Sequence, residues 1–331
     1  MYDFLFRFDA NERVGAGHFQ RALALIQILS SRGYSVACCG DYTEDYQYRL
    51  GRQNLSFFPV DSALQARCLV FDYYGDFDDF IASGVSFKAM VVFEDLSARG
   101  HSRADLVINA FGDPEDLGSR YPRAQVLCGV EYLVFREHLN TLKKNASYQP
   151  AVRHQKSVLV SLGGTDQSAV LTRVLSVICD LLDPDIQIKV LSPVNLTVPD
   201  RCLLHVGLVD NFLERALASD LIICGLGQSF LEMQALGKAC IGLMLAENQS
   251  ACAKSLAEYQ LNIIQNITAL ESSLAEYLQA EFSEFLASGS RVYPSESWRE
   301  TKMTGSQRLI LEDKLGSEKE CLIDRMVALL V

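Results

Sequence analysis

The sequence lacks the signals that would direct a chain into or across a membrane. Its 331 residues contain no basic stretch followed by a long apolar run at the start. They also contain no uninterrupted apolar run of about 18 residues, the length expected of a membrane-spanning helix. We therefore expect no signal peptide, no membrane span and a cytoplasmic location.

Positive charge is also in short supply. The chain carries 30 Lys and Arg against 41 Asp and Glu, which gives a net charge of -11. Proteins whose affinity comes from neutralising nucleic-acid phosphates need a dense basic face. We therefore expect no nucleic-acid partner. An anion that binds must be held by groups in its own site and not by the overall charge of the protein.

Cysteine pairs with metal-binding spacing are missing as well. Cys38 and Cys39 are adjacent and the other eight of the ten cysteines are scattered, without the C-x-x-C spacing of structural zinc sites. In an intracellular protein, most such cysteines are reduced core thiols. The sequence predicts neither a metal site nor a cofactor.

Apolar residues, in contrast, are plentiful enough for two domains. They make up 49% of the chain, and a chain of this length usually divides into two domains. Short apolar runs alternate with helical or loop segments, which predicts parallel sheets covered on both faces. The predicted strands are 2–8, 34–39, 68–72, 89–93 and 106–109 in the first half, and 157–162, 186–191, 203–206, 221–224 and 239–243 in the second.

The predicted fold class is α/β, with two Rossmann-like domains, parallel sheets and a cleft between the domains. The chain becomes polar between residues 145 and 155, so we place the boundary between domains 1–150 and 151–331 there. Helical patterns at 18–32, 274–286 and 318–330 predict helices, and the last two carry acidic residues that favour packing over membrane binding.

Residues that directly follow the predicted strands are the candidate ligand-binding residues, because ligands of open parallel sheets bind beyond the strands' carboxyl ends. Gly15-Ala16-Gly17-His18 follows the first strand and opens a helix, with Arg21 one turn onward. The glycines permit close approach of a ligand, and free N–H groups at a helix start can hold an anion or sugar hydroxyls. The motif does not match the full dinucleotide fingerprint, and a histidine that opens a helix is more often a surface or capping residue.

The second domain has three motifs of the same kind. Gly163-Gly164-Thr165 is typical of a phosphate-binding turn or of a plain strand-to-helix turn, and an ATPase P-loop is excluded because no Gly-Lys-Ser/Thr follows. The loop 225–232 places small residues toward a phosphate and Glu232 toward ribose hydroxyls, although Ser229 and Glu232 also fit a capping box. Glu247-Asn248-Gln249 offers three hydrogen-bonding side chains.

The order of these motifs resembles the PseG-type family of UDP-2,4-diacetamido-2,4,6-trideoxy-β-L-altropyranose hydrolases of pseudaminic acid biosynthesis, which is related to the GT-B glycosyltransferases that include MurG. The resemblance spans nearly the whole chain. It is carried by Arg7-Phe8-Asp9, Gly15-Ala16-Gly17-His18, Arg21, Asp72-Tyr73-Tyr74-Gly75, Phe93-Glu94-Asp95, Gly129, Tyr132, residues 162–166, residues 225–232, Glu247-Asn248-Gln249, residues 311–313 and Gly316.

The resemblance implies a GT-B architecture and hydrolysis of the bond between the sugar's anomeric carbon and UDP. The first domain would hold the sugar, and the second would bind the nucleotide. The implied catalytic residues are His18, Tyr74 and Asn248. The implied nucleotide-binding residues are Gly163, Gly164, Thr165, Gly225, Gly227, Gln228, Ser229 and Glu232. The implied sugar-binding residues are Asp9, Gly17, Arg21, Glu247 and Gln249. His18 would position or deprotonate water, since the unperturbed pKa of histidine lies near neutrality.

Two departures from the family pattern leave other functions open. Tyr73 stands where that family often has His, and Glu94 replaces the first Asp of a usual Asp-Asp pair. The expected partner is a UDP-sugar, bound by a monomer or a homodimer. A GT-B glycosyltransferase is the first alternative, because transfer and hydrolysis differ mainly in whether a hydroxyl or water accepts the sugar. A non-catalytic nucleotide-sugar-binding protein is the second. Residues 280–304 match no motif and receive no role.

Overall fold

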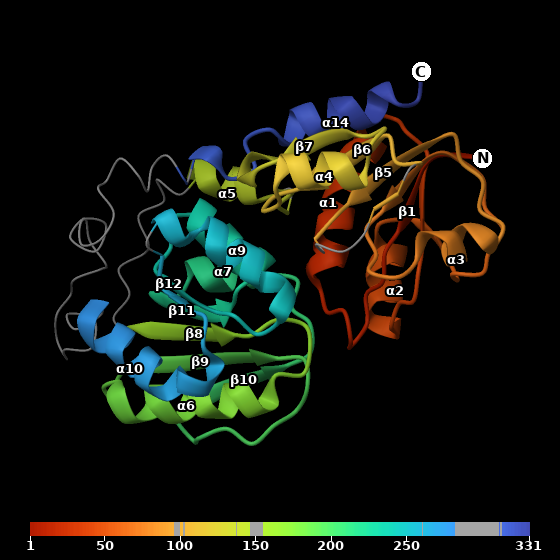
Figure 1. The fold of residues 1–331 in the computed structure, drawn as a ribbon. Helices are drawn as coiled ribbons and strands as arrows, with labels where there is room; N and C mark the ends of the chain where they lie inside the picture. The colour runs from red at the N-terminus through yellow and green to blue at the C-terminus, as the bar shows by residue number, and fades with distance from the viewer. Residues whose placement is uncertain are drawn as a thin grey trace. The chain divides into compact units, whose positions relative to one another are not determined.

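The computed structural model describes residues 1–95, 100–101, 103–136, 138–145, 155–259, 261–281, 311 and 313–331 (Figure 1). The chain divides into two compact units. Unit 1 comprises Met1–Glu137 and Lys314–Val331, and unit 2 comprises His138–Asp313. The predicted boundary at residue 150 therefore lies within unit 2, and the last residues return to unit 1.

Unit 1 is built on a seven-stranded sheet in which every pair of neighbours is parallel. Its strand order is β3-β2-β1-β4-β5-β6-β7. The strands are β1 (Tyr2–Arg7), β2 (Val36–Cys39), β3 (Ser56–Phe58), β4 (Ala66–Phe71), β5 (Ala89–Phe93), β6 (Leu106–Asn109) and β7 (Gln125–Cys128). The central strands are buried along most of their length, as expected for a sheet covered on both faces.

Unit 1 has five α-helices among its described residues, and two of them start at a capping aspartate. The five are α1 (Gly17–Ser31), α2 (Glu44–Arg52), α3 (Phe77–Ala82), α4 (Pro114–Arg120) and α14 (Lys319–Ala328), with the short 3-10 helix η1 (Val130–Tyr132). Asp76 and Asp113 accept backbone N–H bonds at the starts of α3 and α4, which satisfies donors that a helix leaves unpaired. Phe77 and Phe80 of α3 and Leu117 of α4 join one apolar core with the sheet residues Leu5 and Leu69.

Helix α14 belongs to unit 1 although it lies at the end of the chain. The backbone N–H groups of Gly316 and Glu318 donate to Val130 and Glu131 of η1, at 2.9 Å each. Arg32, which follows α1, pairs with Glu320 and Asp324 on α14. These contacts explain why the last residues are part of the first unit.

Unit 2 has a six-stranded parallel sheet in the order β10-β9-β8-β11-β12-β13. Its strands are β8 (Ser157–Ser161), β9 (Gln187–Ser192), β10 (Cys202–Val206), β11 (Leu221–Gly225), β12 (Cys240–Leu243) and β13 (Ile263–Ile264). Its helices are α5 (His138–Asn145), α6 (Ser168–Leu181), α7 (Phe212–Leu217), α8 (Gln228–Ala235), α9 (Ser250–Ser255) and α10 (Leu270–Glu281), with 3-10 turns η2 (Glu247–Gln249), η3 (Ala257–Tyr259) and η4 (Ile267–Ala269).

Helices α6 and α10 lie side by side on one face of this sheet (Figure 1). Leu171 and Val174 of α6 and Leu274 of α10 share a core with Val158 and Ile223 of the sheet. The predicted helix 274–286 thus begins earlier, at Leu270, and its predicted end lies outside the described residues.

The predicted α/β fold with two Rossmann-like parallel sheets is confirmed. All ten predicted strands are present, and their ends shift by at most two residues. The strands β3, β7 and β13 were not predicted. All three are short and lie at the edges of their sheets, and Ser56 and Phe57 of β3 are exposed. Within the described ranges, no helix has both the length and the apolar content needed to cross a bilayer.

Both sheets reverse their strand order at an equivalent place. In unit 1 the reversal lies between β1 and β4, and in unit 2 it lies between β8 and β11. Such topological switch points are where doubly wound sheets bind ligands, beyond the carboxyl ends of the strands. The predicted motifs at residues 9–18, 72–75, 162–166 and 225–232 follow these four strands.

Candidate functional site

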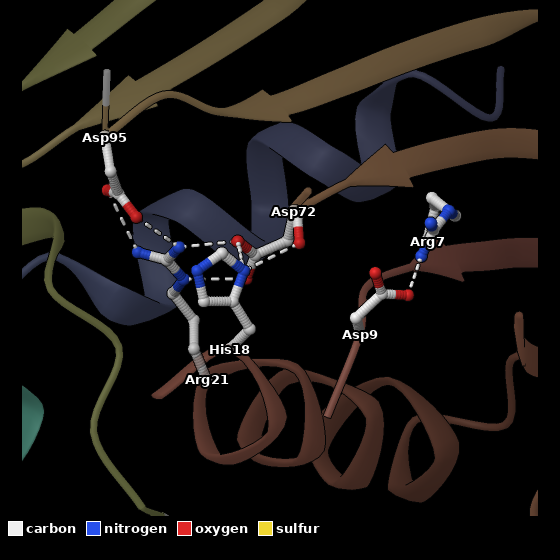
Figure 2. Close-up of polar contacts among 6 residues, drawn as sticks. All are labelled: Arg7, Asp9, His18, Arg21, Asp72 and Asp95. Carbon is white, nitrogen blue, oxygen red and sulfur yellow. Dashed lines mark hydrogen bonds and ion pairs between the residues drawn. The ribbon is translucent and has the colours of Figure 1, made fainter. Parts of the chain in front are cut away.

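A buried histidine–aspartate pair lies at the switch point of unit 1. His18 is the second residue of α1, and Asp72 directly follows β4, which pairs with β1. The His18 Nδ1 atom lies 2.9 Å from Asp72 Oδ1 and 2.8 Å from the Asp72 carbonyl oxygen (Figure 2). The two side chains are only 7% and 2% exposed.

This geometry determines which nitrogen of His18 can take part in chemistry. Both oxygens near Nδ1 are acceptors. Nδ1 therefore carries the proton and donates a hydrogen bond to Asp72. The neutral ring then has its lone pair on Nε2, which makes no hydrogen bond among the described residues. A histidine held in this way can accept a proton at Nε2 while the carboxylate stabilises the resulting imidazolium.

Arg21 joins the pair to a second carboxylate. It lies three residues after His18, so both side chains project from the same face of α1. Its Nε and Nη2 atoms donate to Asp72 at 2.8 and 2.6 Å, and its Nη2 and Nη1 atoms donate to Asp95 at 2.7 and 3.3 Å (Figure 2). Asp95 follows β5, the neighbour of β4. The four side chains, which we call the His18 cluster, come from one helix and two strand ends.

The charges of the His18 cluster shift one another's pKa values. Burial alone would lower the pKa of His18, but the Asp72 carboxylate outweighs burial and raises it above its usual 6.5. Burial alone would raise the pKa of the Asp72 carboxyl, but Arg21 and His18 hold it well below its usual range. Asp72 is therefore a carboxylate near neutral pH, and His18 is a stronger base than an exposed histidine.

The arrangement of the His18 cluster also bears on metal binding. One ligand atom from each of His18, Asp72 and Asp95 lies within 4.8 Å of the others, which is close enough to surround a cation. The Arg21 guanidinium, however, already bonds both carboxylates. A cation would have to displace this buried guanidinium, so the geometry favours an ion-paired cluster.

Tyr74 packs on the histidine. The two ring centroids are 4.6 Å apart and the rings are nearly perpendicular, at 85°. Tyr74 is 36% exposed, whereas His18 beneath it is buried. The structure thus brings the predicted catalytic residues His18 and Tyr74 together.

Asp9 and Tyr73 form a second group with Arg7. The Arg7 guanidinium pairs with Asp9 (Figure 2). The Arg7 Cζ atom lies 3.6 Å from the centre of the Tyr73 ring. Asp9 also accepts the Asp41 backbone N–H at 2.8 Å. Asp9, predicted to bind sugar, is thus bonded within the protein and braces the loop after β1. Tyr73, the departure from the family pattern, stacks on a buried arginine.

Glu94, the other departure, is fully buried and serves the fold. Its carboxylate accepts the hydroxyl of Tyr121, which follows α4, and lies 3.9 Å from an Arg120 nitrogen. The longer side chain of Glu compared with Asp reaches this hydroxyl. Glu94 therefore anchors the end of β5, directly before Asp95.

The turn after β8 in unit 2 carries an acidic side chain at the helix start. Gly163 has a φ of +113°, a conformation that favours glycine. The Asp166 Oδ1 atom accepts the Ser168 backbone N–H at 2.9 Å, and Gln167 Nε2 donates to the Thr165 hydroxyl at 3.1 Å. A negative side chain at this position competes with an anionic ligand for the first N–H groups of α6.

The turn after β11 is better suited to an anion. Gly227 is the N-cap residue of α8, so no side chain at that position caps the first N–H groups of the helix. The alternative interpretation, a capping box from Ser229 to Glu232, is wrong because the N-cap is Gly227 and Ser229 lies inside the helix. Gln228 Nε2 donates to the buried Glu232 at 3.4 Å. Small residues before uncapped N–H groups favour phosphate binding.

The third motif of unit 2 forms the short helix η2. Gln249 Oε1 accepts the backbone N–H groups of Leu245 and Ala246 at 2.7 and 3.2 Å, so its side chain shapes the turn. Glu247 and Asn248 are exposed. The predicted catalytic role of Asn248 stays a prediction. So do the predicted sugar contacts of Glu247 and of Gly17, which is exposed at the start of α1.

The sequence prediction missed two members of the His18 cluster. Asp72 and Asp95 were part of the recognised motifs but received no role, and Arg21 was predicted to bind sugar. In the structure Arg21 makes four hydrogen bonds to these two carboxylates. The signal that could have found them is their position within two residues of the ends of neighbouring parallel strands.

Comparisons with known proteins agree with this fold. No family model matches the chain. The uncharacterized protein MJ1062 of Methanocaldococcus jannaschii is 23% identical over an alignment of 298 residues, and the match covers 77% of this chain and 59% of that protein. The chain thus spans about three fifths of the length of this curated relative.

Three solved structures share the architecture over nearly their whole length. HepE of Anabaena, in complex with UDP-glucose, has a TM-score of 0.59 at 11% identity and covers 100% of this chain and 99% of its own. The glycotransferase of kitacinnamycin has a TM-score of 0.59 at 12% identity, with 100% of both chains covered. MurG of Acinetobacter baumannii has a TM-score of 0.51 at 13% identity, with 98% and 99% covered. The predicted GT-B architecture is confirmed, and these similarities concern the fold.

Proposed function

We propose that the protein hydrolyses a UDP-linked deoxy amino sugar to the free sugar and UDP, as a step of nonulosonic acid biosynthesis of the pseudaminic type. UDP-2,4-diacetamido-2,4,6-trideoxy-β-L-altrose is the substrate that the sequence resemblance favours. The observation that supports hydrolysis most is the buried His18–Asp72 pair at the switch point of unit 1. The pair provides a base at His18 Nε2, and the contacts of Nδ1 with Asp72 fix the orientation of the imidazole ring.

In this proposal His18 Nε2 removes a proton from water. The water oxygen attacks the anomeric carbon, and the bond from that carbon to the phosphate oxygen breaks with its electron pair on UDP. The proton stays on His18, where Asp72 stabilises the charged ring, and is later released to solvent. Because UDP is a stable anion, its departure needs little protonation and benefits from N–H groups directed at the phosphates.

The nucleotide is assigned to unit 2. The uncapped start of α8, with Gly225 and Gly227 before it, supports binding of the phosphates more strongly than the turn at Gly163, where Asp166 bonds the first N–H group of α6. HepE, which shares the fold, was solved with UDP-glucose. In this proposal Gln228, the first residue of α8, and Glu232, one turn into the helix, contact the ribose.

The test is incubation of the purified protein with a panel of UDP-sugars, including the diacetamido-trideoxy-altrose compound, while NMR follows the anomeric proton. Free sugar and UDP should appear with the wild-type protein and not with His18→Gln, which keeps a polar side chain but has no basic nitrogen. Binding of a UDP-sugar with no cleavage by the wild-type protein would contradict hydrolysis. That outcome would favour the non-catalytic alternative or a missing acceptor.

A glycosyltransferase is the second candidate function. One structural neighbour with a TM-score of 0.59 is named as a glycotransferase, and the same base can deprotonate a sugar or peptide hydroxyl instead of water. In that case release of UDP depends on an added acceptor. Hydrolysis at the same rate with and without a panel of hydroxyl acceptors would argue against transfer.

A further inference from the structure

Asp95 is the outer member of the His18 cluster. It lies two residues after β5, and its side chain is 30% exposed. Both of its carboxylate oxygens accept hydrogen bonds from Arg21, at 2.7 and 3.3 Å. No hydrogen bond joins Asp95 to His18 among the described residues, so any effect on the histidine passes through Arg21 or through its charge.

The guanidinium of Arg21 is held on three sides. Asp72 takes the Nε edge, Asp95 takes the Nη1 edge, and the Nη2 atom is shared between them at 2.6 and 2.7 Å. The Arg21 Cζ atom lies 4.7 Å from the centre of the Phe93 ring. Without Asp95, the Nη1 atom of Arg21 loses its hydrogen bond to that carboxylate. The positive charge of Arg21, which lies next to His18, is then balanced by Asp72 alone of the two carboxylates that it pairs with.

We propose that Asp95 is a positioning residue of the His18 site, which fixes the Arg21 guanidinium against Asp72 and balances its charge so that the Asp72 carboxylate stays directed at Nδ1. This proposal rests on the proposed function only where turnover is measured. The positioning itself concerns the unliganded protein.

The groups that face His18 come from three elements and make the direction of the effect clear. Asp72 follows β4, Arg21 lies on α1, and Asp95 follows β5, while the uncharged ring of Tyr74 covers the histidine. The charges of Asp72 and Asp95 favour the protonated ring, and the charge of Arg21 disfavours it. Removal of the Asp95 charge should therefore lower the pKa of His18.

The experiment is an NMR titration of the histidine Cε1–H signals between about pH 5 and 9, where unperturbed histidines change charge. The chain has five histidines, and the His18 signal is the one that disappears in His18→Gln. In Asp95→Asn the pKa of His18 should fall by about one pH unit, and Asp95→Glu should keep the wild-type value. Where turnover is measurable, the acid limb of kcat/KM should move by the same amount.

Asp116→Asn is the matched control, because Asp116 is an exposed carboxylate of unit 1 that also pairs with an arginine, Arg120. It should leave the His18 titration unchanged. Asp95→Ser provides a second neutral variant, and dispersed amide signals establish that each variant is folded. An unchanged His18 titration in either folded neutral variant overturns the proposal. A lowered pKa in a protein that cleaves no UDP-sugar supports the positioning role and contradicts only the proposed function.

Discussion

The switch points of the two units have the same strand topology but very different contents. In unit 1 the space beyond β1 and β4 holds the His18 cluster, which is buried and charged. In unit 2 the space beyond β8 and β11 holds Gly163, Gly225 and Gly227 and the uncapped start of α8. In the proposed function, the same framework supplies fixed side chains for proton transfer in one unit and backbone N–H groups for an anion in the other.

The strongest test of this division separates turnover from binding. His18→Gln should lower kcat by about 10²- to 10⁴-fold, the usual contribution of a general base. UDP affinity, measured by calorimetry, should stay within about twofold, because the nucleotide is assigned to unit 2. If UDP binding falls together with turnover, His18 belongs to the binding site and the division fails.

A matching change in unit 2 should have the opposite effect. At Gly227 an added Cβ would find its nearest neighbour, Gln249 Nε2, at 3.9 Å, so a larger residue fits the fold. Gly227→Val should nevertheless fill the space at the start of α8 and weaken UDP binding by about tenfold or more, the effect of roughly 1.4 kcal/mol. Gly51→Val on α2 is the control, since its Cβ meets nothing within 4 Å. Equal UDP affinity in both variants would remove α8 from the nucleotide site.

The charged switch point should also make the stability of the protein depend on pH. The pKa of Asp72 is lower in the folded protein than its usual 3.8, so its stabilising effect is present above that value and disappears as pH falls through the folded pKa. Asp72→Asn should therefore cost about 3 kcal/mol near pH 7, because it leaves buried partners uncompensated. Urea unfolding should show a difference from wild type that begins to shrink only as pH falls below about 4 and that is clearly smaller at pH 3. A constant difference would mean that the carboxylate charge contributes nothing.

The smallest effect is expected at the other turn of unit 2. Asp166 is exposed and bonds the start of α6, where it competes with an anion. If the phosphates bind at α8, Asp166→Ala should change UDP affinity by less than about twofold, as is usual for an exposed charge. A large gain in affinity, measured in the same calorimetric series, would move the phosphate site to the Gly163 turn.

Much of this comparison could be predicted from the sequence, since apolar runs mark the central strands and glycine-rich or polar motifs follow them. The structure confirms the two predicted Rossmann-like sheets and the predicted strands that flank each switch point. The pairing inside the His18 cluster could not be predicted. Arg21 lies 51 and 74 residues before its two partners, and only the parallel pairing of β1, β4 and β5 brings them together.

The roles of individual polar residues were the least predictable part. Asp9 and Gln249 occur where ligand contacts are expected, yet both bond nearby backbone N–H groups. Glu94 also follows a strand directly, but its carboxylate accepts the Tyr121 hydroxyl in the core. The hydrogen-bond partner of a polar side chain depends on the geometry of the loop around it. The pattern of hydrophobic residues in the sequence does not specify that geometry.

The return of α14 to unit 1 has a consequence for biosynthesis of the chain. Arg32 and Arg67, on the early part of unit 1, bond Glu320 and the Leu330 carbonyl near the end. As the ribosome adds residues in order, unit 2 has all of its chain available before unit 1 does. The first sheet to be synthesised is therefore the last to receive its full set of contacts.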